Sequence, residues 1–252
     1  MQLTEEQYKQ IADVFPRQRG NVQLDNLRVL NAILYVAANG CKWRALPERY
    51  GKWNTVYVRM MRWSRAGVLD RVFEQLQRRR LMRVRIEAIS LDSSIVKVHP
   101  DGTGAPQKNG PQSIGKSRGG WSTKLHLVAA DERNVVTWSL TPGQAGDAPE
   151  GRRLIEQLGP HEGRVALLMD SAYQDDATRE LAQRLGLVPV VPPNPQRRQP
   201  WEYDRQLYRQ RNCVERLLRR LKAWRRVFTR YDKLDAMFAA FITCALIAES
   251  LR

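Results

Sequence analysis

The stretch Val165-Ala166-Leu167-Leu168-Met169-Asp170 decides the fold of this 252-residue chain. A continuous apolar run of this length is typical of a strand that is buried on both faces in the middle of a parallel sheet. Asp170 follows at the carboxyl end of that strand, where functional side chains gather in open α/β sheets. The alternative is an aspartate that caps a turn, because Ser171 and a helical pattern come next. The stretch predicts an α/β protein and offers Asp170 as a candidate site residue.

The segments around this strand alternate between strand and helix patterns. Strands are predicted at residues 86–98, 123–130, 134–140, 165–169 and 187–191. Helices are predicted at residues 147–158, 175–185, 203–224 and 234–251, the first of them opened by a capping box of Asp147 and Glu150. Residues 99–120 and 192–200 are rich in turn formers and are predicted to be loops. The order of three strands, helix, strand, helix, strand, helix, helix is that of the ribonuclease-H-like fold, a mixed sheet with flanking helices.

The first part of the chain has a different character. Residues 1–85 contain 17 basic and 7 acidic side chains, a net charge of +10, whereas residues 86–252 contain 25 and 19, a net charge of +6. Helices are predicted at 4–14, 24–40, 54–67 and 68–80, and Arg59, Arg62 and Arg65 line one face of the third. This is typical of a helix-turn-helix-like DNA-binding domain, and the alternative is a small helical bundle with a solvated arginine face. We expect two domains, residues 1–82 and 83–252.

The composition of the whole chain points to a nucleic-acid partner. Lys and Arg total 42 against 26 Asp and Glu, so the formal net charge is +16. Such a charge favours binding to a polyanion, and the alternative is a basic protein without one. The apolar content of 42% excludes intrinsic disorder. The longest apolar run, residues 236–248, is shorter than the roughly 20 residues of a membrane span. We expect no membrane partner.

The cysteines and the N-terminus bear on the compartment. Cys41, Cys213 and Cys244 are scattered, with neither a disulfide framework nor a zinc-type spacing. The first residues are polar and acidic, without the pattern of a signal peptide. We expect a reducing, intracellular environment.

Three carboxylates on different elements are candidate metal ligands. Asp92 lies within an apolar strand, Asp170 ends another, and Glu215 lies on the helix predicted at 203–224. A charge in an apolar strand is costly unless it is paired or bound to a metal. Oxygen ligands suit Mg²⁺, and two such ions stabilise the attacking and leaving oxygens of a phosphodiester. The alternatives are aspartates that cap turns and a Glu215 paired with arginines along a solvated helix.

Helical spacing adds information about Glu215. Tyr208, Arg211, Glu215 and Lys222 fall within an arc of roughly 60° at 100° per residue. They lie beside the apolar stripe of the helix. These four polar side chains are therefore expected along the edge of its buried face.

These motifs resemble those of a known family, the DDE transposases of the insertion sequence five branch of bacterial insertion sequences. Its signature Y-x2-R-x3-E-x6-K is matched by Tyr208, Arg211, Glu215 and Lys222 with every spacing met. Similar motifs extend over nearly the whole chain, at residues 41–47, 50–53, 91–94, 115–120, 123–127 and 168–173.

The resemblance implies an active site and a reaction. It implies Asp92, Asp170 and Glu215 as the catalytic, metal-binding triad, with two Mg²⁺ ions for which Mn²⁺ can substitute. It implies cleavage by water at the ends of the element and attack of the freed 3′-OH groups on target DNA, without a covalent enzyme intermediate. It also implies a helical domain that recognises the terminal inverted repeats and a place in the bacterial cytoplasm, on the nucleoid. Joining two ends argues for at least a homodimer.

The resemblance further implies particular DNA contacts. Tyr208, Arg211 and Lys222 are expected near the cleaved end. Lys116, Arg118 and Lys124 are further candidates, against the alternative of solvated loop charge. Some relatives carry a large β insertion before the glutamate helix, where this chain has only the loop at 192–200, so Trp201 is considered for stacking on a flipped base, against the alternative of a core tryptophan.

Two other functions remain open from the sequence. A ribonuclease-H-like nuclease without joining activity would need the triad but not the four-residue signature. A non-catalytic DNA-binding protein would tolerate loss of any carboxylate. His126 is expected to face the interior or a neighbouring loop, with a catalytic role as the alternative.

Overall fold

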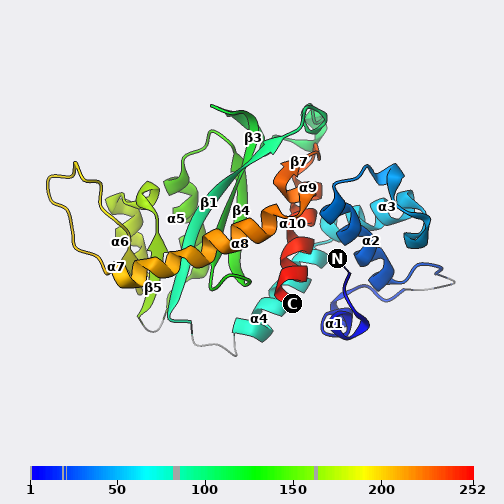
Figure 1. Cartoon of the computed structure of the whole chain (residues 1–252), viewed down its shortest axis with the longest axis horizontal. Helices are drawn as coiled ribbons and strands as arrows, with labels where there is room; N and C mark the ends of the chain where they lie inside the picture. Colours follow the sequence, from blue (N-terminus) through cyan, green and yellow to red (C-terminus); the bar gives the residue numbers. More distant parts are fainter. Residues whose placement is uncertain (1, 19, 21, 82–85, 162–163) are drawn as a thin grey trace. The chain divides into compact units, whose positions relative to one another are not determined.

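The computed structural model of the chain describes residues 2–18, 20, 22–81, 86–161 and 164–252 (Figure 1). Contacts within the chain divide it into two compact units. The first comprises Met1–Arg80, Val96–Gln112 and Arg220–Arg252, and the second comprises Leu81–Ile95 and Ser113–Arg219.

The second unit holds a mixed sheet. Strand β1 (Ala88–Val98) lies between β3 (Gly120–Ala129) and β5 (Val165–Met169), and β6 (Leu187–Val190) lies beyond β5. β4 (Val135–Pro142) pairs antiparallel with β3, whereas β5 pairs parallel with both β1 and β6. The strands therefore follow the order β4, β3, β1, β5, β6, which is the order of the ribonuclease-H-like fold and confirms the predicted fold class.

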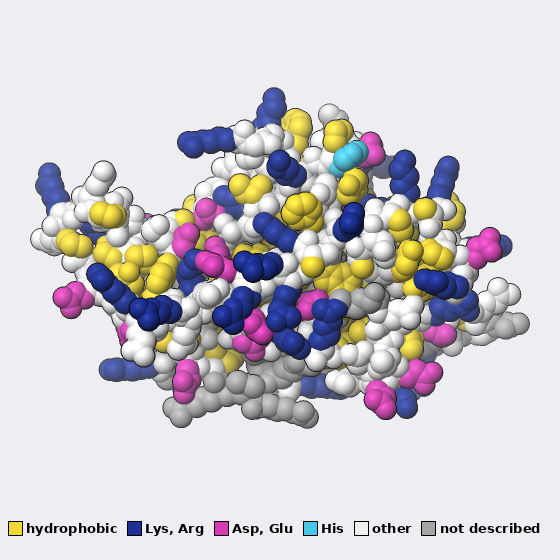
Figure 2. Space-filling model, viewed as in Figure 1, with side chains coloured by type: hydrophobic (Ala, Val, Ile, Leu, Met, Phe, Trp, Pro, Cys, Tyr) yellow, Lys and Arg dark blue, Asp and Glu magenta, His cyan; other side chains and the backbone are white. Residues whose placement is uncertain are grey.

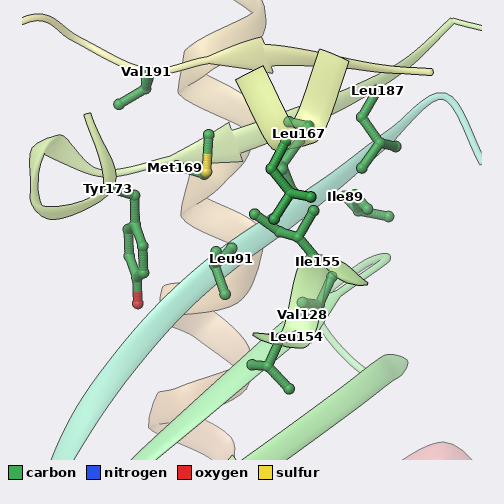
Figure 3. Packing of buried hydrophobic residues seen from close by; sticks show 12 residues of the cluster. Ile89, Leu91, Val128, Leu154, Ile155, Leu167, Met169, Tyr173, Leu187 and Val191 are labelled. Carbon is green, nitrogen blue, oxygen red and sulfur yellow. The ribbon is translucent and has the colours of Figure 1, made fainter. Parts of the chain in front are cut away.

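Helices cover both faces of this sheet. The side chains of β5 point alternately to the two faces, so each face presents apolar side chains to its own helices. On one face, Leu167 and Met169 belong to a core cluster with Leu154 and Ile155 of α5 (Asp147–Leu158), and several of these side chains point toward one another in Figure 3. The cluster also includes two residues of α6 (Asp176–Arg184), Leu181 and Ala182.

On the other face, Ala166 and Leu168 pack with residues around α7 (Arg205–Tyr208), namely Tyr203, Leu207 and Tyr208. Helix α8 (Asn212–Lys222) follows, and its Cys213 lies 3.4 Å from the Ser90 hydroxyl of β1. A central strand buried from both sides explains the unbroken apolar run of β5.

The first unit is mainly helical. It contains α1 (Glu5–Lys9), α2 (Asn26–Asn39), α3 (Trp53–Arg65), α4 (Val68–Leu81), α9 (Arg225–Phe228) and α10 (Asp235–Ser250). Thr4 caps α1 with a full capping box, and Gly40 ends α2 in the left-handed conformation. Val56, Met60 and Trp63 are buried, as their spacing predicted. No helix within the described ranges is both long and apolar enough to cross a membrane.

The compact units do not coincide with the predicted domains of 1–82 and 83–252. Helix α10 packs against α2 and α3, so the end of the chain belongs to the same unit as its first 80 residues. A sequence-based boundary could not show this, because it follows the order of the chain rather than its contacts. The assignment of DNA recognition to residues 1–82 and of catalysis to residues 83–252 stays a prediction.

Several elements differ from the sequence prediction. Strand β2 (Gly115–Ser117) forms a hairpin with β3 inside the predicted loop, and a two-residue strand, β7 (Thr229–Arg230), pairs with the end of β1. The long helix predicted at 203–224 is divided by a 3₁₀ turn at Arg209–Arg211. Both short strands are below the length at which a periodic pattern is visible.

The predicted capping box of α5 is wrong. Gly146 occupies the N-cap position without a side-chain cap. Asp147 binds Ser93 and Lys124, and Glu150 binds Arg153. Tertiary partners therefore take the Asp147 carboxylate, and Glu150 pairs with an arginine three residues further along the same helix.

His126 of β3 lies in the interior, as expected. Its side chain is fully buried, with Nε2 at 2.8 Å from the Thr141 hydroxyl. Burial lowers the pKa of His126 to about 4, despite the nearby acids Asp147 and Glu150. The imidazole is thus held neutral in the folded protein.

We expect Gly151→Ala to destabilise the protein by about 1–3 kcal/mol. A Cβ at Gly151 would lie 2.6 Å from the Tyr173 ring and 3.1 Å from Leu91, so overpacking outweighs the better helix propensity of alanine. Urea unfolding followed by circular dichroism measures the change. Gly119→Ala is the control, because a Cβ there has no neighbour closer than 4.0 Å. Equal stability of the two variants would contradict this packing.

We expect His126→Gln to reduce the loss of stability on acidification. Between pH 6.5 and pH 4 the unfolded chain binds a proton that folded His126 does not, so stability falls as the pH is lowered. Between pH 7.5 and pH 5 this amounts to about 2 kcal/mol from His126 alone. Urea unfolding of wild type and variant at both pH values measures the difference. An identical pH dependence in the two proteins would show that His126 is not held neutral.

Candidate active site

Asp92 and Asp170 lie side by side at the end of the parallel pairing between β1 and β5. The last paired residues are Leu91 and Met169; Asp92 is the next residue of β1, and Asp170 directly follows the end of β5. Neighbouring strands are about 4.8 Å apart, so the two carboxylates leave the sheet next to each other. The charge of Asp170 acts on Asp92 accordingly. The register thus places the first two acids of the predicted triad together.

Glu215 is connected to Asp92 by Arg211. The Arg211 guanidinium donates from Nη1 to Asp92 Oδ2 at 2.9 Å and from Nη2 to Glu215 Oε1. Asp92 and Arg211 are mostly buried, with 15% and 17% of their side chains exposed, whereas 52% of Glu215 is exposed. A cation therefore lies between two of the three predicted acids.

Tyr208 supports this arrangement from one helical turn away. The Arg211 guanidinium carbon lies 5.8 Å from the centre of the Tyr208 ring, and Tyr208 packs against β5 residues on its other side. Burial works against the charge of Arg211, but Asp92, Tyr208 and Glu215 raise the pKa of Arg211 overall. Three of the four signature residues thus form one contact group. Lys222, the fourth, is the last residue of α8 and belongs to the other compact unit.

The buried position of Asp92 disfavours the charged form of its carboxyl group. Burial raises the pKa of Asp92, and Asp170 adds to the effect, against the Ser93 amide and Arg211. Asp92 Oδ1 accepts a hydrogen bond from the Ser93 N–H at 2.7 Å, and Asp170 Oδ1 accepts one from Ala172 N–H at 2.6 Å. Asp170 therefore caps the short turn that follows it, the alternative foreseen for this residue, while facing Asp92.

The three acids carry the type of ligand atom that a hard divalent cation prefers. They offer oxygen atoms alone, and a positive group already bridges two of them. Within the described residues, no group of three or more His, Cys, Asp or Glu side chains is close enough to hold a metal ion. In this conformation the positive charge between Asp92 and Glu215 is the guanidinium of Arg211.

A second polar cluster adjoins the site and was not found from the sequence. Asp147 Oδ1 accepts from the Ser93 hydroxyl at 2.6 Å and from Lys124 Nζ at 3.0 Å. Lys124 is 8% exposed and also donates to the Ala145 carbonyl at 2.7 Å. Lys124 stands beside Leu125 in β3, and a buried lysine requires an anionic partner, but the sequence does not show that this lysine is buried.

The predicted DNA contacts fall into two groups. Lys116 and Arg118 are exposed on the β2–β3 hairpin, and Arg62 and Arg65 are exposed on α3. Lys124 and Arg59 differ from them. Lys124 is buried against Asp147, and Arg59 donates to the Leu24 carbonyl at 2.8 Å. In this conformation both serve the fold, so the structure lends no support to their predicted DNA contacts.

Trp201 is also engaged in packing. Its indole N–H donates to the Val191 carbonyl at 2.8 Å, and it packs against the main core cluster of the second unit. The guanidinium carbons of Arg179 and Arg197 lie 3.6 and 4.8 Å from its ring centre. Stacking on a flipped base would require these arginines to move, so this conformation favours the alternative of a core tryptophan.

Solved structures align with this chain at low sequence identity. A piggyBac transposase synaptic complex with hairpin DNA aligns with a TM-score of 0.44 and 11% identity, over 77% of this chain and 50% of that chain. A Mos1 mariner paired-end complex with Mn aligns with a TM-score of 0.27 and 15% identity, over 73% and 65%. The chain thus spans about half the length of the piggyBac chain.

Sequence comparisons are more specific. The "Uncharacterized protein y4sN" of Sinorhizobium fredii is 32% identical over 111 residues, 43% of this chain and 86% of that protein. The "Putative transposase for insertion sequence element IS6501" of Brucella ovis is 31% identical over 129 residues, 50% of this chain and 97% of that protein.

Two family models account for almost all of the chain. Residues 3–73 match a family described as "Putative transposase of IS4/5 family", and residues 84–249 match the "Transposase DDE domain". The second match alone covers more than half of the chain, and it contains Asp92, Asp170 and Glu215. This chain belongs to the family of DDE-domain transposases.

Proposed function

We propose that this protein binds the terminal inverted repeats of its own element, cuts the DNA at both ends to free 3′-OH groups, and joins these to target DNA. The observation that carries the proposal is the group of Asp92, Asp170 and Glu215 within a DDE domain, two of them adjacent across paired strands and the third tied to the first by Arg211.

The chemistry calls for divalent metal. Asp92, Asp170 and Glu215 are the residues that would hold Mg²⁺, in two sites, with Mn²⁺ as a substitute. Such ions supply Lewis-acid stabilisation of the attacking and leaving oxygens in an in-line phosphoryl transfer. The partial burial of Asp92 strengthens electrostatic interactions there, because the surrounding medium has a low dielectric constant.

Under this proposal, two kinds of anion compete for the Arg211 guanidinium: the site carboxylates and a DNA phosphate. Without DNA its guanidinium neutralises Asp92 and Glu215. A phosphate of bound DNA is an equally good bidentate partner for a guanidinium. We infer that Arg211 moves from the carboxylates to a phosphate when DNA binds, which frees the carboxylates.

Other basic side chains would hold the DNA. Figure 2 shows Lys and Arg side chains crowded around acidic ones over the region where α8 runs. Tyr208 and Lys222 are proposed contacts near the cleaved end, and the exposed Lys116 and Arg118 are further proposed DNA contacts. Arg62 and Arg65 of α3 are proposed contacts of the inverted-repeat domain. Such contacts to phosphate position the duplex and make binding depend on salt.

The proposed partners follow from the reaction. They are double-stranded DNA, as element ends and as target, and a second copy of the chain, because two ends are joined in one event. A protein with these partners works on the bacterial nucleoid.

Glu215→Gln tests the proposal directly, because it removes one ligand charge and keeps the side-chain shape. We expect end-specific nicking and joining in Mg²⁺ to fall by about 1,000-fold or more, the loss of several kcal/mol of transition-state stabilisation. The assay uses DNA carrying the element's own ends. Glu180→Gln, on the exposed face of α6, is the matched control and should retain activity.

Two results of the same assay would overturn the proposal. Nicking by wild type without joined product would favour a nuclease. Binding to the ends without cleavage would favour a non-catalytic DNA-binding protein.

Arg211→Gln tests the competition at the carboxylates. Without DNA, we expect this variant to bind Mn²⁺ about 10- to 100-fold more tightly than wild type, the equivalent of one charged hydrogen bond. Its strand transfer should be lower, because a phosphate contact is lost. Electron paramagnetic resonance of free Mn²⁺ measures the affinity. Arg216→Gln, which removes an exposed arginine of α8 that pairs with Glu132, is the control. Unchanged or weaker Mn²⁺ binding by Arg211→Gln would refute the competition.

A further inference from the structure

Asp147 opens helix α5 but does not cap it. A carboxylate in the first turn of a helix is normally stabilised by the free N–H groups and by the helix dipole. Gly146 stands at the N-cap, and no side chain caps the helix. The Asp147 carboxylate instead reaches β1, where it accepts from the Ser93 hydroxyl at 2.6 Å. The Asp147 carboxylate thus makes a contact next to Asp92 instead of the helix cap that its position in the first turn would favour.

Lys124 holds the Asp147 carboxylate in this orientation. Its ammonium lies 3.0 Å from Asp147 Oδ1, the same oxygen that accepts from Ser93. The Lys124 side chain is nearly buried and is fixed a second time by the Ala145 carbonyl at 2.7 Å. A buried ammonium is costly without an anion, which keeps the pair together in the folded protein. Lys124 of β3 and the loop before α5 therefore fix the position of the Asp147 carboxylate, which is the acceptor for the Ser93 hydroxyl.

Ser93 transmits this constraint to Asp92. Successive side chains of a strand point to opposite faces, so the Ser93 hydroxyl and the Asp92 carboxylate lie on different sides of β1. The amide between them belongs to Ser93, and it donates to Asp92 Oδ1 at 2.7 Å. The residue whose hydroxyl binds Asp147 on one face is therefore also the residue whose amide binds the Asp92 carboxylate.

The Tyr173 hydroxyl faces the same region. Tyr173 is 1% exposed, and in the described part of the chain its hydroxyl has no hydrogen-bond partner. Burial and the charges of Asp147, Asp92 and Asp170 raise the pKa of Tyr173, against the lowering effect of the Ser93 side chain. Its proton is therefore retained, which leaves a buried donor beside these acids.

We propose that Asp147, fixed by Lys124, is a positioning residue that holds the carboxylate of Asp92 in its present orientation at the site through Ser93. The inference rests on the proposed role of Asp92 as a metal ligand. It adds Ser93, Asp147 and Lys124 as residues that support this ligand. Residues that orient metal ligands typically affect metal affinity by 10- to 100-fold when they are changed.

The test compares Mn²⁺ binding by full-length variants at a temperature where each is shown to be folded by circular dichroism. Ser93→Ala and Asp147→Asn should each weaken Mn²⁺ binding by about 10-fold or more. The double variant should be no weaker than the worse single variant, because both changes break the same link. Ser93→Thr keeps the hydroxyl and should bind as wild type does. Ser122→Ala, which loses a buried hydroxyl bond to Ser117, is the matched control.

A crystal structure of Ser93→Ala gives a readout that needs no metal. We expect Asp92 to leave its present rotamer or to occupy two. Wild-type Mn²⁺ affinity in Ser93→Ala and Asp147→Asn, or additive losses in the double variant, would overturn the positioning role. If wild type takes up no Mn²⁺, the proposed metal site fails, and an unchanged Asp92 rotamer in Ser93→Ala would overturn the positioning role independently.

Discussion

The parallel pairing of β1 with β5 is the constraint on which the site depends. Its register ends at Leu91 and Met169, and it leaves Asp92 and Asp170 as neighbours at one edge of the sheet. A shift by one residue would turn Asp92 to the opposite face and Leu91 to the site. The apolar contacts that prevent such a shift are those of Leu91, Leu167 and Met169 with α5. The core that stabilises the fold is therefore also what aligns the two aspartates.

Much of this arrangement could be predicted from the sequence because it rests on local patterns. The apolar run before Asp170 specifies a buried strand, and the strand pattern around Asp92 specifies its neighbour. Helical spacing places Tyr208, Arg211 and Glu215 on a common edge, and the structure brings these three into contact with one another or with Asp92. Periodicity and burial determine these features over short distances, so one sequence is enough to infer them.

The features that were not predicted depend on partners far apart in the chain. Asp147 has the local pattern of a helix cap, but Ser93 and Lys124 take its carboxylate. Lys124 looks like a surface cation in a basic chain, yet it is buried. The grouping of α10 with α2 and α3 likewise follows from packing between distant segments. In each case a tertiary contact competes with a local preference, and the sequence displays only the local one.

The bridge formed by Arg211 has a thermodynamic consequence. One guanidinium cannot neutralise two carboxylates and a DNA phosphate at the same time, so under the proposed function its transfer links two binding equilibria. Linkage is reciprocal: by whatever factor bound DNA raises the affinity for metal, bound metal raises the affinity for DNA. A protein free of DNA would then bind metal poorly, because its own arginine would hold two of the carboxylates until a phosphate replaced them.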